Sequence, residues 1–301
     1  MKILLTGGAG YIGGRLGRAL NCSGIHEVAA LDNLRRGRRE AVADGVRFIE
    51  GDVRDAKLLD EITRGVDLIY HLAAESAVMS AAADPEYCFE TNVAGTFRVL
   101  RTAQANGVKR VVFSSSREVY GECAELPVAE TATLLPRNVY GASKAAGEMC
   151  CGAFLNADLE ISVVRLANVY GPGDQGRVIP KFVHAALRGD PLTLFGTAQV
   201  MDFVWIDAVV EALVRLGTGP YLAGPFNIGS GKGTTIVDLA RRVVAAANST
   251  STVEVAARRD VEVMRFEADT RAAERELGLK IPDDPLFGLP AVIAAARVAL
   301  Q

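Results

Sequence analysis

Three polar side chains have the types and spacing of a proton-transfer site. Tyr140 and Lys144 stand four residues apart at the predicted start of a helix, which puts both on one face about one turn apart. An ammonium beside a phenol favours the phenolate, so the pair predicts a lowered pKa for Tyr140 and a role as general base. Ser116 ends a predicted strand and is placed to hydrogen-bond the same substrate oxygen. Although tyrosine and lysine at this spacing also occur in packing roles, the three together predict removal of a hydroxyl proton as hydride leaves the same carbon.

A glycine-rich turn near the start of the chain predicts where the hydride acceptor binds. The segment KILLTGGAGYIG, residues 2–13, joins an apolar strand to a helix through Gly7, Gly10 and Gly13. The first glycine permits the turn, the second leaves room for phosphates, and the third lets helix and strand pack closely. Any strand-to-helix turn can use glycine, but this spacing indicates a dinucleotide diphosphate at the helix N-terminus.

An acidic residue after the second strand indicates which dinucleotide is bound. Asp32 follows the glycines by about 20 residues, where a carboxylate accepts the adenosine ribose hydroxyls. That carboxylate would repel a 2′-phosphate, so NAD is favoured over NADP as the cofactor. Two interpretations remain for the arginines that follow, namely a 2′-phosphate site or a solvated basic loop. These arginines are Arg35, Arg36, Arg38 and Arg39.

Alternating strand and helix patterns predict a doubly wound parallel Rossmann sheet of the α/β class, with a smaller mixed α/β substrate lobe. The rhythm loosens beyond Arg165. We expect the NAD-binding domain at 1–166 and about 201–228, and the substrate-binding lobe at about 167–200 and 229–301. Strands are expected near 2–6, 27–31, 46–49, 67–71, 110–114 and 161–166.

One helix carries both of its boundary signals. The pattern predicts a helix from about Pro85 to Ala105, with Asp84 as N-cap and Pro85 in the first turn. Asn106 and Gly107 mark its end. A second helix is expected at about 140–155.

The composition of the chain limits the classes of binding partner that can be expected. The 301 residues are 50% hydrophobic, enough for a large core, and 33 basic against 36 acidic residues give a net charge of −3. This balance indicates neither nucleic acid nor an anionic membrane as a partner. A first strand at residue 2 leaves no room for a signal peptide, so a cytoplasmic location is expected. No metal site is expected, because His26, His71 and His184 are scattered among different elements.

The ordered motifs of the whole chain resemble the extended short-chain dehydrogenase/reductases, specifically the NAD-dependent sugar-nucleotide epimerases and dehydratases. The serine-rich strand end is similar to that of UDP-glucose 4-epimerases. The matching segments are TGGAGYIG, DNL, GDVRD, HLAA, TNV, FSSSREVYGE, YGASK, RLANVYGPGD, MDFVWIDAVVEA, FNIGSGK and ADTRAAERELG.

The resemblance implies roles for individual residues. Ser116, Tyr140 and Lys144 match the catalytic triad, and Asp52 with Val53 matches the pair that holds adenine. The implied cofactor contacts are Gly7, Gly10, Tyr11, Ile12, Gly13, Asp32, Asn33, Asp52, Val53, Leu72, Ala73, Ala74, Asn92, Ser114, Tyr140 and Lys144. The implied substrate contacts are Ser116, Glu118, Asn168, Val178 and Arg259, with Asn168 and Arg259 on the nucleotide diphosphate. A homodimer is also implied, built from the helices at about 85–105 and 140–155.

Departures from the family pattern guide the choice of reaction. Dehydratases carry an acidic pair where this chain has Arg117 and Glu118, so 4,6-dehydration is disfavoured. Glu118 keeps one carboxylate, as some sugar-acid decarboxylases do, and the serine-rich strand end is the reason to prefer epimerisation. Met201 replaces an arginine that commonly holds the diphosphate, and Glu75 brings an unusual carboxylate towards the site. The expected function is C4 epimerisation of a UDP- or dTDP-linked hexose or uronic acid through a 4-keto intermediate. The alternatives are a 4-ketosugar reductase, a sugar-acid decarboxylase and a non-catalytic NAD(P)-binding regulator.

Overall fold

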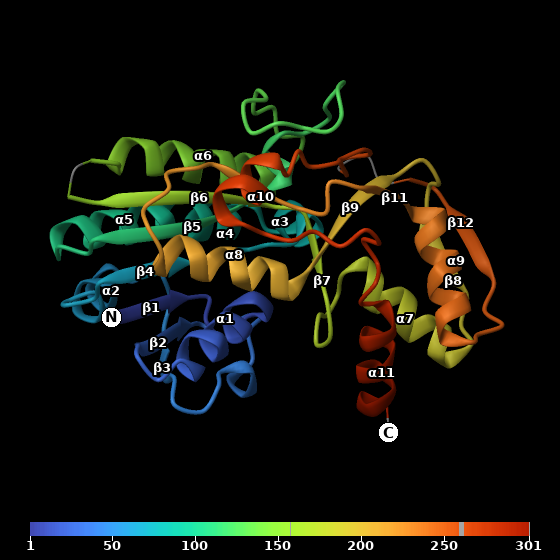
Figure 1. Cartoon of the computed structure of the whole chain (residues 1–301), viewed down its shortest axis with the longest axis horizontal. Coiled ribbons are helices and arrows are strands. Elements are labelled where there is room, and N and C mark those ends of the chain that lie inside the picture. The colour runs from blue at the N-terminus through green and yellow to red at the C-terminus, as the bar shows by residue number, and fades with distance from the viewer. Residues whose placement is uncertain (157, 259–261, 301) are drawn as a thin grey trace.

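A parallel sheet of seven strands forms the larger part of the molecule (Figure 1). The strands are β1 (Lys2–Thr6), β2 (Glu27–Asp32), β3 (Arg47–Glu50), β4 (Leu68–His71), β5 (Arg110–Ser116), β6 (Glu160–Leu166) and β10 (Phe226–Ile228). In this computed structural model, which describes residues 1–156, 158–258 and 262–300, their order is β10-β6-β5-β4-β1-β2-β3. Every neighbouring pair is parallel. The predicted Rossmann sheet is confirmed, and the six strands expected from the sequence occur within two residues of their predicted bounds.

Helices cover both faces of the sheet, as the buried apolar strands require. On one face lie α1 (Tyr11–Cys22) and α8 (Ile206–Thr218), which pack against each other and against the strands. The opposite face carries α2 (Ala56–Ile62), α5 (Thr96–Ala105) and α6 (Val139–Phe154). Each face has its own apolar core. Two short 3₁₀ turns, η1 (Arg39–Ala41) and η3 (Arg117–Val119), follow β2 and β5.

The helix expected from Pro85 to Ala105 has the predicted ends and an unexpected interior. Asp84 Oδ1 accepts the Tyr87 amide hydrogen at 3.1 Å, as an N-cap does, and Asn106 is the C-cap. Between these ends the helix is divided. It follows α3 (Val78–Ala83) and consists of α4 (Pro85–Phe89), the π turn η2 (Glu90–Gly95) and α5. A π turn inserts an extra residue and rotates the side chains within it, often at functional sites.

A smaller mixed α/β lobe lies beside the sheet, on the right in Figure 1. Its helices α7, α9 and α11 pack against one another around a separate apolar core. The strands form a three-stranded sheet, β11-β9-β7, and a two-stranded sheet, β12-β8. The elements of this lobe are β7 (Asn168–Tyr170), α7 (Val178–Arg188), β8 (Leu192–Phe195), β9 (Val200–Trp205), β11 (Gly233–Thr235), α9 (Ile236–Ala247), β12 (Val253–Ala256) and α11 (Leu289–Ala299).

The chain passes between the two lobes more than once. After β7, α7, β8 and β9 it returns as α8 and β10, which cover and extend the large sheet. After β11, α9 and β12 it returns again as α10 (Arg271–Leu277), which packs against β10 and α8. The predicted borders of the two lobes stay a prediction.

Two possible features are not found in the described part of the chain. No helix there is long and apolar enough to cross a membrane. Nor do these residues contain a group of three or more histidine, cysteine, aspartate or glutamate side chains that could hold a metal ion.

Candidate active site

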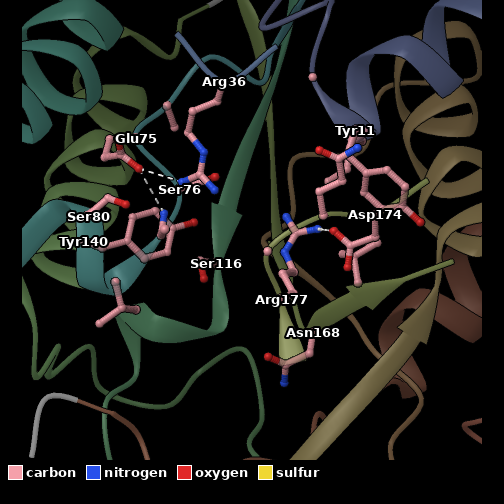
Figure 2. Close-up of a pocket in the computed structure, with 18 of the residues that line it drawn as sticks. Tyr11, Arg36, Glu75, Ser76, Ser80, Ser116, Tyr140, Asn168, Asp174 and Arg177 are labelled. Atoms are coloured by element: carbon pink, nitrogen blue, oxygen red, sulfur yellow. Dashed lines mark hydrogen bonds and ion pairs between the residues drawn. The ribbon is translucent and has the colours of Figure 1, made fainter. Parts of the chain in front are cut away.

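The carboxyl ends of the parallel strands open onto a cavity of about 1120 Å³. Its wall combines the glycine turn after β1, the end of β5, the start of α6 and the loop before α7 (Figure 2). Open α/β sheets bind ligands at this position. The predicted site residues that line the cavity are Gly7, Gly10, Tyr11, Ile12, Gly13, Asp32, Asn33, Asp52, Val53, Leu72, Ala73, Ala74, Ser114, Ser116, Glu118, Tyr140, Lys144, Asn168 and Val178.

Two predicted site residues are not among them. Asn92 lies in the π turn and is buried behind the wall, where its Oδ1 accepts the Glu75 amide hydrogen at 2.8 Å. Its Nδ2 donates to the Glu75 carbonyl at 3.0 Å and to Ser143 Oγ at 2.8 Å. Asn92 therefore fixes the segment after β4 against α6, whereas a direct cofactor contact was expected. Arg259 lies outside the described residues.

The glycine turn has the geometry that its spacing predicts. Gly7 has a φ of +71°, and a Cβ there would lie 2.7 Å from the Ala73 backbone nitrogen. A Cβ on Gly13 would lie 2.2 Å from the carbonyl oxygen of Gly7, so only glycine lets α1 approach the turn this closely. Gly10 is the N-cap of α1 and provides no side-chain cap, which leaves the helix N-terminus available to an anion facing the cavity.

Asp32 is held at the end of β2 by two backbone hydrogen bonds. Its Oδ2 accepts from the Ala9 nitrogen at 3.0 Å, and its Oδ1 accepts from the Leu34 nitrogen at 2.9 Å. Burial raises the pKa of this carboxyl above its usual value, while the two hydrogen bonds act in the opposite direction. Its place beside the glycine turn fits the ribose of a dinucleotide.

Beside Asp32, a cluster of polar side chains lies at the end of the cavity that is formed by β2 and the segment after β3. Asn33 Nδ2 donates to Asp52 Oδ2 at 2.8 Å and to the Tyr87 hydroxyl at 3.0 Å. Arg54 donates to both carboxylate oxygens of Asp52, at 2.9 and 2.8 Å. Burial acts to raise the pKa of Asp52, but the hydrogen bonds from Arg54 and Asn33 prevail and lower it to about 2. Asp52 is therefore an ionised acceptor at neutral pH.

The proton-transfer residues meet where β5 ends and α6 begins. Asn138 caps α6 by accepting the Gly141 amide hydrogen at 2.8 Å, and Tyr140 and Lys144 follow on one helical face. Tyr140 and Ser116 are both buried, and both line the cavity. The Lys144 ammonium is also buried, donates to the Ser114 carbonyl at 2.7 Å and lies 4.9 Å from the Phe113 ring centre.

The pKa of Tyr140 shifts in the direction opposite to the one expected. Burial raises it to about 12, and the nearby Ser116 hydroxyl opposes this rise only in part. Burial also lowers the pKa of Lys144 to about 8. Removing both groups from water thus disfavours their charged forms more than their neighbours favour them.

Glu118 has both carboxylate oxygens occupied. Oε1 lies 2.8 Å from Nη2 of Arg117, and Oε2 accepts from Asn138 Nδ2 at 2.7 Å. Arg117 and Glu118 are both buried. Although Glu118 lines the cavity, its carboxylate is engaged within the protein.

The opposite wall belongs to the smaller lobe. Asn168 Nδ2 donates to the Asp202 carbonyl at 2.9 Å, and Val178 is the first residue of α7. Arg177, the N-cap of that helix, pairs with Asp174 at 2.7 Å and lies 5.6 Å from the Tyr11 ring centre (Figure 2). The Asp174 side chain is only 2% exposed, and burial raises its pKa.

The structure adds two cavity residues that sequence reasoning missed, Asp174 and Arg177. It also pairs two residues that the sequence had singled out separately, because the side chains of Arg36 and Glu75 lie 2.9 Å apart at the cavity wall. The spacing of Asp174 and Arg177, three apart before a helix, was a usable signal. No sequence signal predicted that Arg36 and Glu75 pair, since 39 residues separate them.

Comparison with known proteins gives the family. The model of the NAD dependent epimerase/dehydratase family matches residues 3–229, well over half of the chain. The chain belongs to this family. The family's dependence on NAD agrees with the position of Asp32 and confirms the expected cofactor.

Individual members of the epimerase/dehydratase family are similar over nearly their whole length. A UDP-glucose 4-epimerase of Mycolicibacterium smegmatis is 35% identical over 293 residues, which cover 92% of this chain and 93% of that protein. The structure of a UDP-glucose 4-epimerase of Thermotoga maritima with UDP-glucose is 30% identical, with a TM-score of 0.95 and full coverage of both chains. A dTDP-glucose 4,6-dehydratase of Streptomyces venezuelae, solved with NAD bound, is 34% identical, with a TM-score of 0.93 over 99% of this chain and 97% of that one.

Proposed function

We propose that the protein is an NAD-dependent epimerase that inverts C4 of a nucleotide-linked sugar, a UDP- or dTDP-linked hexose or uronic acid. The observation that carries the proposal is the position of Ser116 and Tyr140, which line one cavity between the glycine turn and the wall of the smaller lobe. A sugar hydroxyl that reaches this pair lies beside the cofactor. The similar proteins of Mycolicibacterium smegmatis and Thermotoga maritima are UDP-glucose 4-epimerases, which supports a substrate of this class.

The chain's own residues move and hold the proton of the sugar 4-hydroxyl. NAD, when bound, supplies the acceptor for the C4 hydride and a positive charge that favours the phenolate. Tyr140 accepts the hydroxyl proton as the C4–H bond breaks, and Ser116 donates a hydrogen bond to the developing carbonyl oxygen. Lys144 would hold the nicotinamide ribose. Tyr140 then returns the proton to the 4-oxygen, and the hydride would come back from bound NAD to the opposite face of C4. The sugar leaves inverted at C4, while Tyr140 and the cofactor end as they began.

The state of Glu118 favours epimerisation over dehydration and decarboxylation. A carboxylate that takes part in those reactions must exchange a proton with the substrate, whereas each oxygen of Glu118 already has a partner, Arg117 on one and Asn138 on the other. Using Glu118 as an acid or base would therefore require breaking a buried ion pair, which is costly.

The diphosphate of the substrate is assigned to the wall formed by the smaller lobe. Asn168 and the N-terminus of α7 at Val178 line this wall, and Arg177 adds a cation whose side chain is 40% exposed. Arginine suits a diphosphate because its planar group donates two hydrogen bonds at once. Met201 also lines the cavity and supplies no such donor, so the binding falls to these residues and to Arg259, which stays a prediction.

The test is direct observation of C4 inversion. The purified protein is incubated separately with UDP-glucose, UDP-galactose, their uronic acid counterparts and the dTDP hexoses, and the sugar protons are followed by NMR. We expect conversion of at least one gluco form into its galacto form without net consumption of NAD.

Other outcomes identify the alternatives. Net oxidation of NADH with a 4-keto sugar would indicate a reductase, and release of carbon dioxide from a uronic acid would indicate a decarboxylase. No reaction with any of these sugars, in protein shown to contain NAD, would overturn the proposal in favour of a binding protein.

We also propose a homodimer built on the face of α4, α5 and α6. Phe89, Phe97 and Met149 are 55%, 45% and 71% exposed on these helices, and such a group of large apolar side chains indicates an interface. A dimer would join these helices from two chains. Sedimentation at micromolar concentration should give twice the mass of the chain, and Met149→Glu should shift the protein towards monomer. A cytoplasmic location stays a prediction.

A further inference from the structure

The loop after β2 reaches across the carboxyl end of β1 to the segment that follows β4. In the sheet, β1 lies between β2 and β4, and the dinucleotide turn follows β1. Three residues of the loop, Asn33, Arg35 and Arg36, contact the segment between residues 75 and 87. These contacts therefore join the two sides of the groove.

Each contact is polar and made by side chains. Arg36 Nη1 pairs with Glu75 Oε1 at 2.9 Å (Figure 2), and Arg35 pairs with Asp84 at 3.1 Å. The Arg35 guanidinium also lies 3.6 Å from the ring centre of Tyr87. The Asn33 side chain adds a hydrogen bond to the hydroxyl of the same tyrosine.

Both sides of this bridge are fixed to the protein core. On the loop side, Leu34 has a φ of +56°, which a leucine rarely adopts, and its nitrogen is held by Asp32 Oδ1 at 2.9 Å. Arg38 then donates its amide hydrogen to the Ala9 carbonyl at 3.0 Å. On the other side, Asn92 fixes the backbone of Glu75 through both its nitrogen and its carbonyl.

The Arg36–Glu75 pair is asymmetric in exposure. The Glu75 side chain is 3% exposed, whereas that of Arg36 is 45% exposed. A buried carboxylate without its partner is unfavourable, which holds the pair closed, but the arginine can leave into solvent. The bridge is therefore suited to opening from the loop side.

We propose that Arg36 and Glu75, supported by the contacts of Asn33 and Arg35, form a strap that closes over bound NAD and slows its release. Both strap residues line the cavity together with the glycine turn. The proposal rests on the proposed function, because an epimerase must keep its reduced cofactor until the hydride has returned to the sugar. It makes Arg36 and Glu75 positioning residues for the cofactor, not catalytic ones.

The test measures NAD release directly. Protein loaded with NAD is diluted into an NAD-scavenging enzyme, and the dissociation rate is compared among the unmodified protein, Arg36→Gln, Glu75→Gln and the double variant. We expect each single variant to release NAD about 3- to 10-fold faster, as loss of a partly exposed ion pair allows. The double variant should be no faster than the faster single variant, because both remove one interaction.

Three controls keep the result specific. Glu211→Gln removes a solvent-exposed ion pair with Arg215 on α8, away from the cavity, and should leave the release rate unchanged. Arg36→Lys keeps the charge and should restore slow release in part. Rising salt should speed release from the unmodified protein more than from Glu75→Gln.

Unchanged NAD release in folded Arg36→Gln and Glu75→Gln protein would overturn the strap, whatever the enzyme catalyses. Faster release would support the strap even if no sugar were epimerised. The two measurements therefore test the strap and the proposed reaction independently.

Discussion

The side-chain amide of Asn138 joins the start of α6 to Glu118, because its Nδ2 donates to Glu118 Oε2 at 2.7 Å. Its Oδ1 at the same time caps the helix by accepting the Gly141 amide hydrogen. One residue thus sets the start of the helix that carries Tyr140 and also occupies the carboxylate that a related reaction would need.

Substitution of Asn138 should separate these two roles. Asn138→Ala removes both hydrogen bonds, and we expect the free energy of unfolding to fall by about 2–4 kcal/mol, from the lost cap and the unpaired carboxylate oxygen. Asn138→Ser keeps a capping oxygen and should lose only the part due to Glu118. Urea unfolding of the two variants measures the difference, and equal losses would contradict the double role.

Tyr140→Phe should reduce turnover without unfolding the protein. Loss of the general base is expected to lower kcat by about 10²- to 10⁴-fold, because proton transfer then lacks its positioned acceptor. The KM for the nucleotide sugar and the NAD content should change little, which distinguishes chemistry from binding. A kcat close to that of the unmodified protein would remove Tyr140 from the mechanism.

The buried Lys144 should make stability depend on pH. Its pKa is about 8 in the folded protein against 10.5 for a lysine exposed to water, so between these pH values the unfolded chain binds more protons. The free energy of unfolding should therefore gain up to about 3 kcal/mol from this group as pH rises from 8 to 10.5. Cysteines and tyrosines titrate in the same range, so the measurement is the difference between the unmodified protein and Lys144→Met. A difference that stays constant with pH would show that Lys144 is not held neutral by burial.

Two glycines offer a matched test of the dinucleotide turn. A Cβ on Gly13 would lie 2.2 Å from the Gly7 carbonyl oxygen, whereas a Cβ on Gly152, in α6, would meet nothing within 4 Å. Gly13→Ala should destabilise the protein by about 1–3 kcal/mol and weaken NAD binding. Gly152→Ala should stabilise it by about 0.5–1 kcal/mol, because alanine favours a helix interior. Thermal unfolding and NAD titration follow both effects, and tight NAD binding by Gly13→Ala would contradict the close approach.

The sequence predicted those features that depend on neighbouring residues. Buried apolar runs located the strands, and Asp84 and Asn106 marked helix ends, since caps act within one turn. The π turn at Glu90–Gly95 was not predicted, because its extra residue follows from packing rather than from a local pattern.

In the candidate site, too, local motifs were predictable from the sequence, whereas features that depend on distant segments were not. The glycine turn and the Tyr140–Lys144 pair are local motifs, and the sequence sufficed to find them. The direction of the Tyr140 pKa shift depends on burial by distant segments, and so does the choice of Arg36, among four nearby arginines, as the partner of Glu75. Neither can be obtained from spacing alone.

The repeated passage of the chain between the lobes links their folding. A fragment ending at residue 166 would lack α8 and β10, so β6 would become an unpaired sheet edge and the apolar face under Val209 and Leu213 would meet water. Neither lobe is a segment that can be excised and expected to fold alone. Heating should accordingly melt both lobes in one cooperative transition.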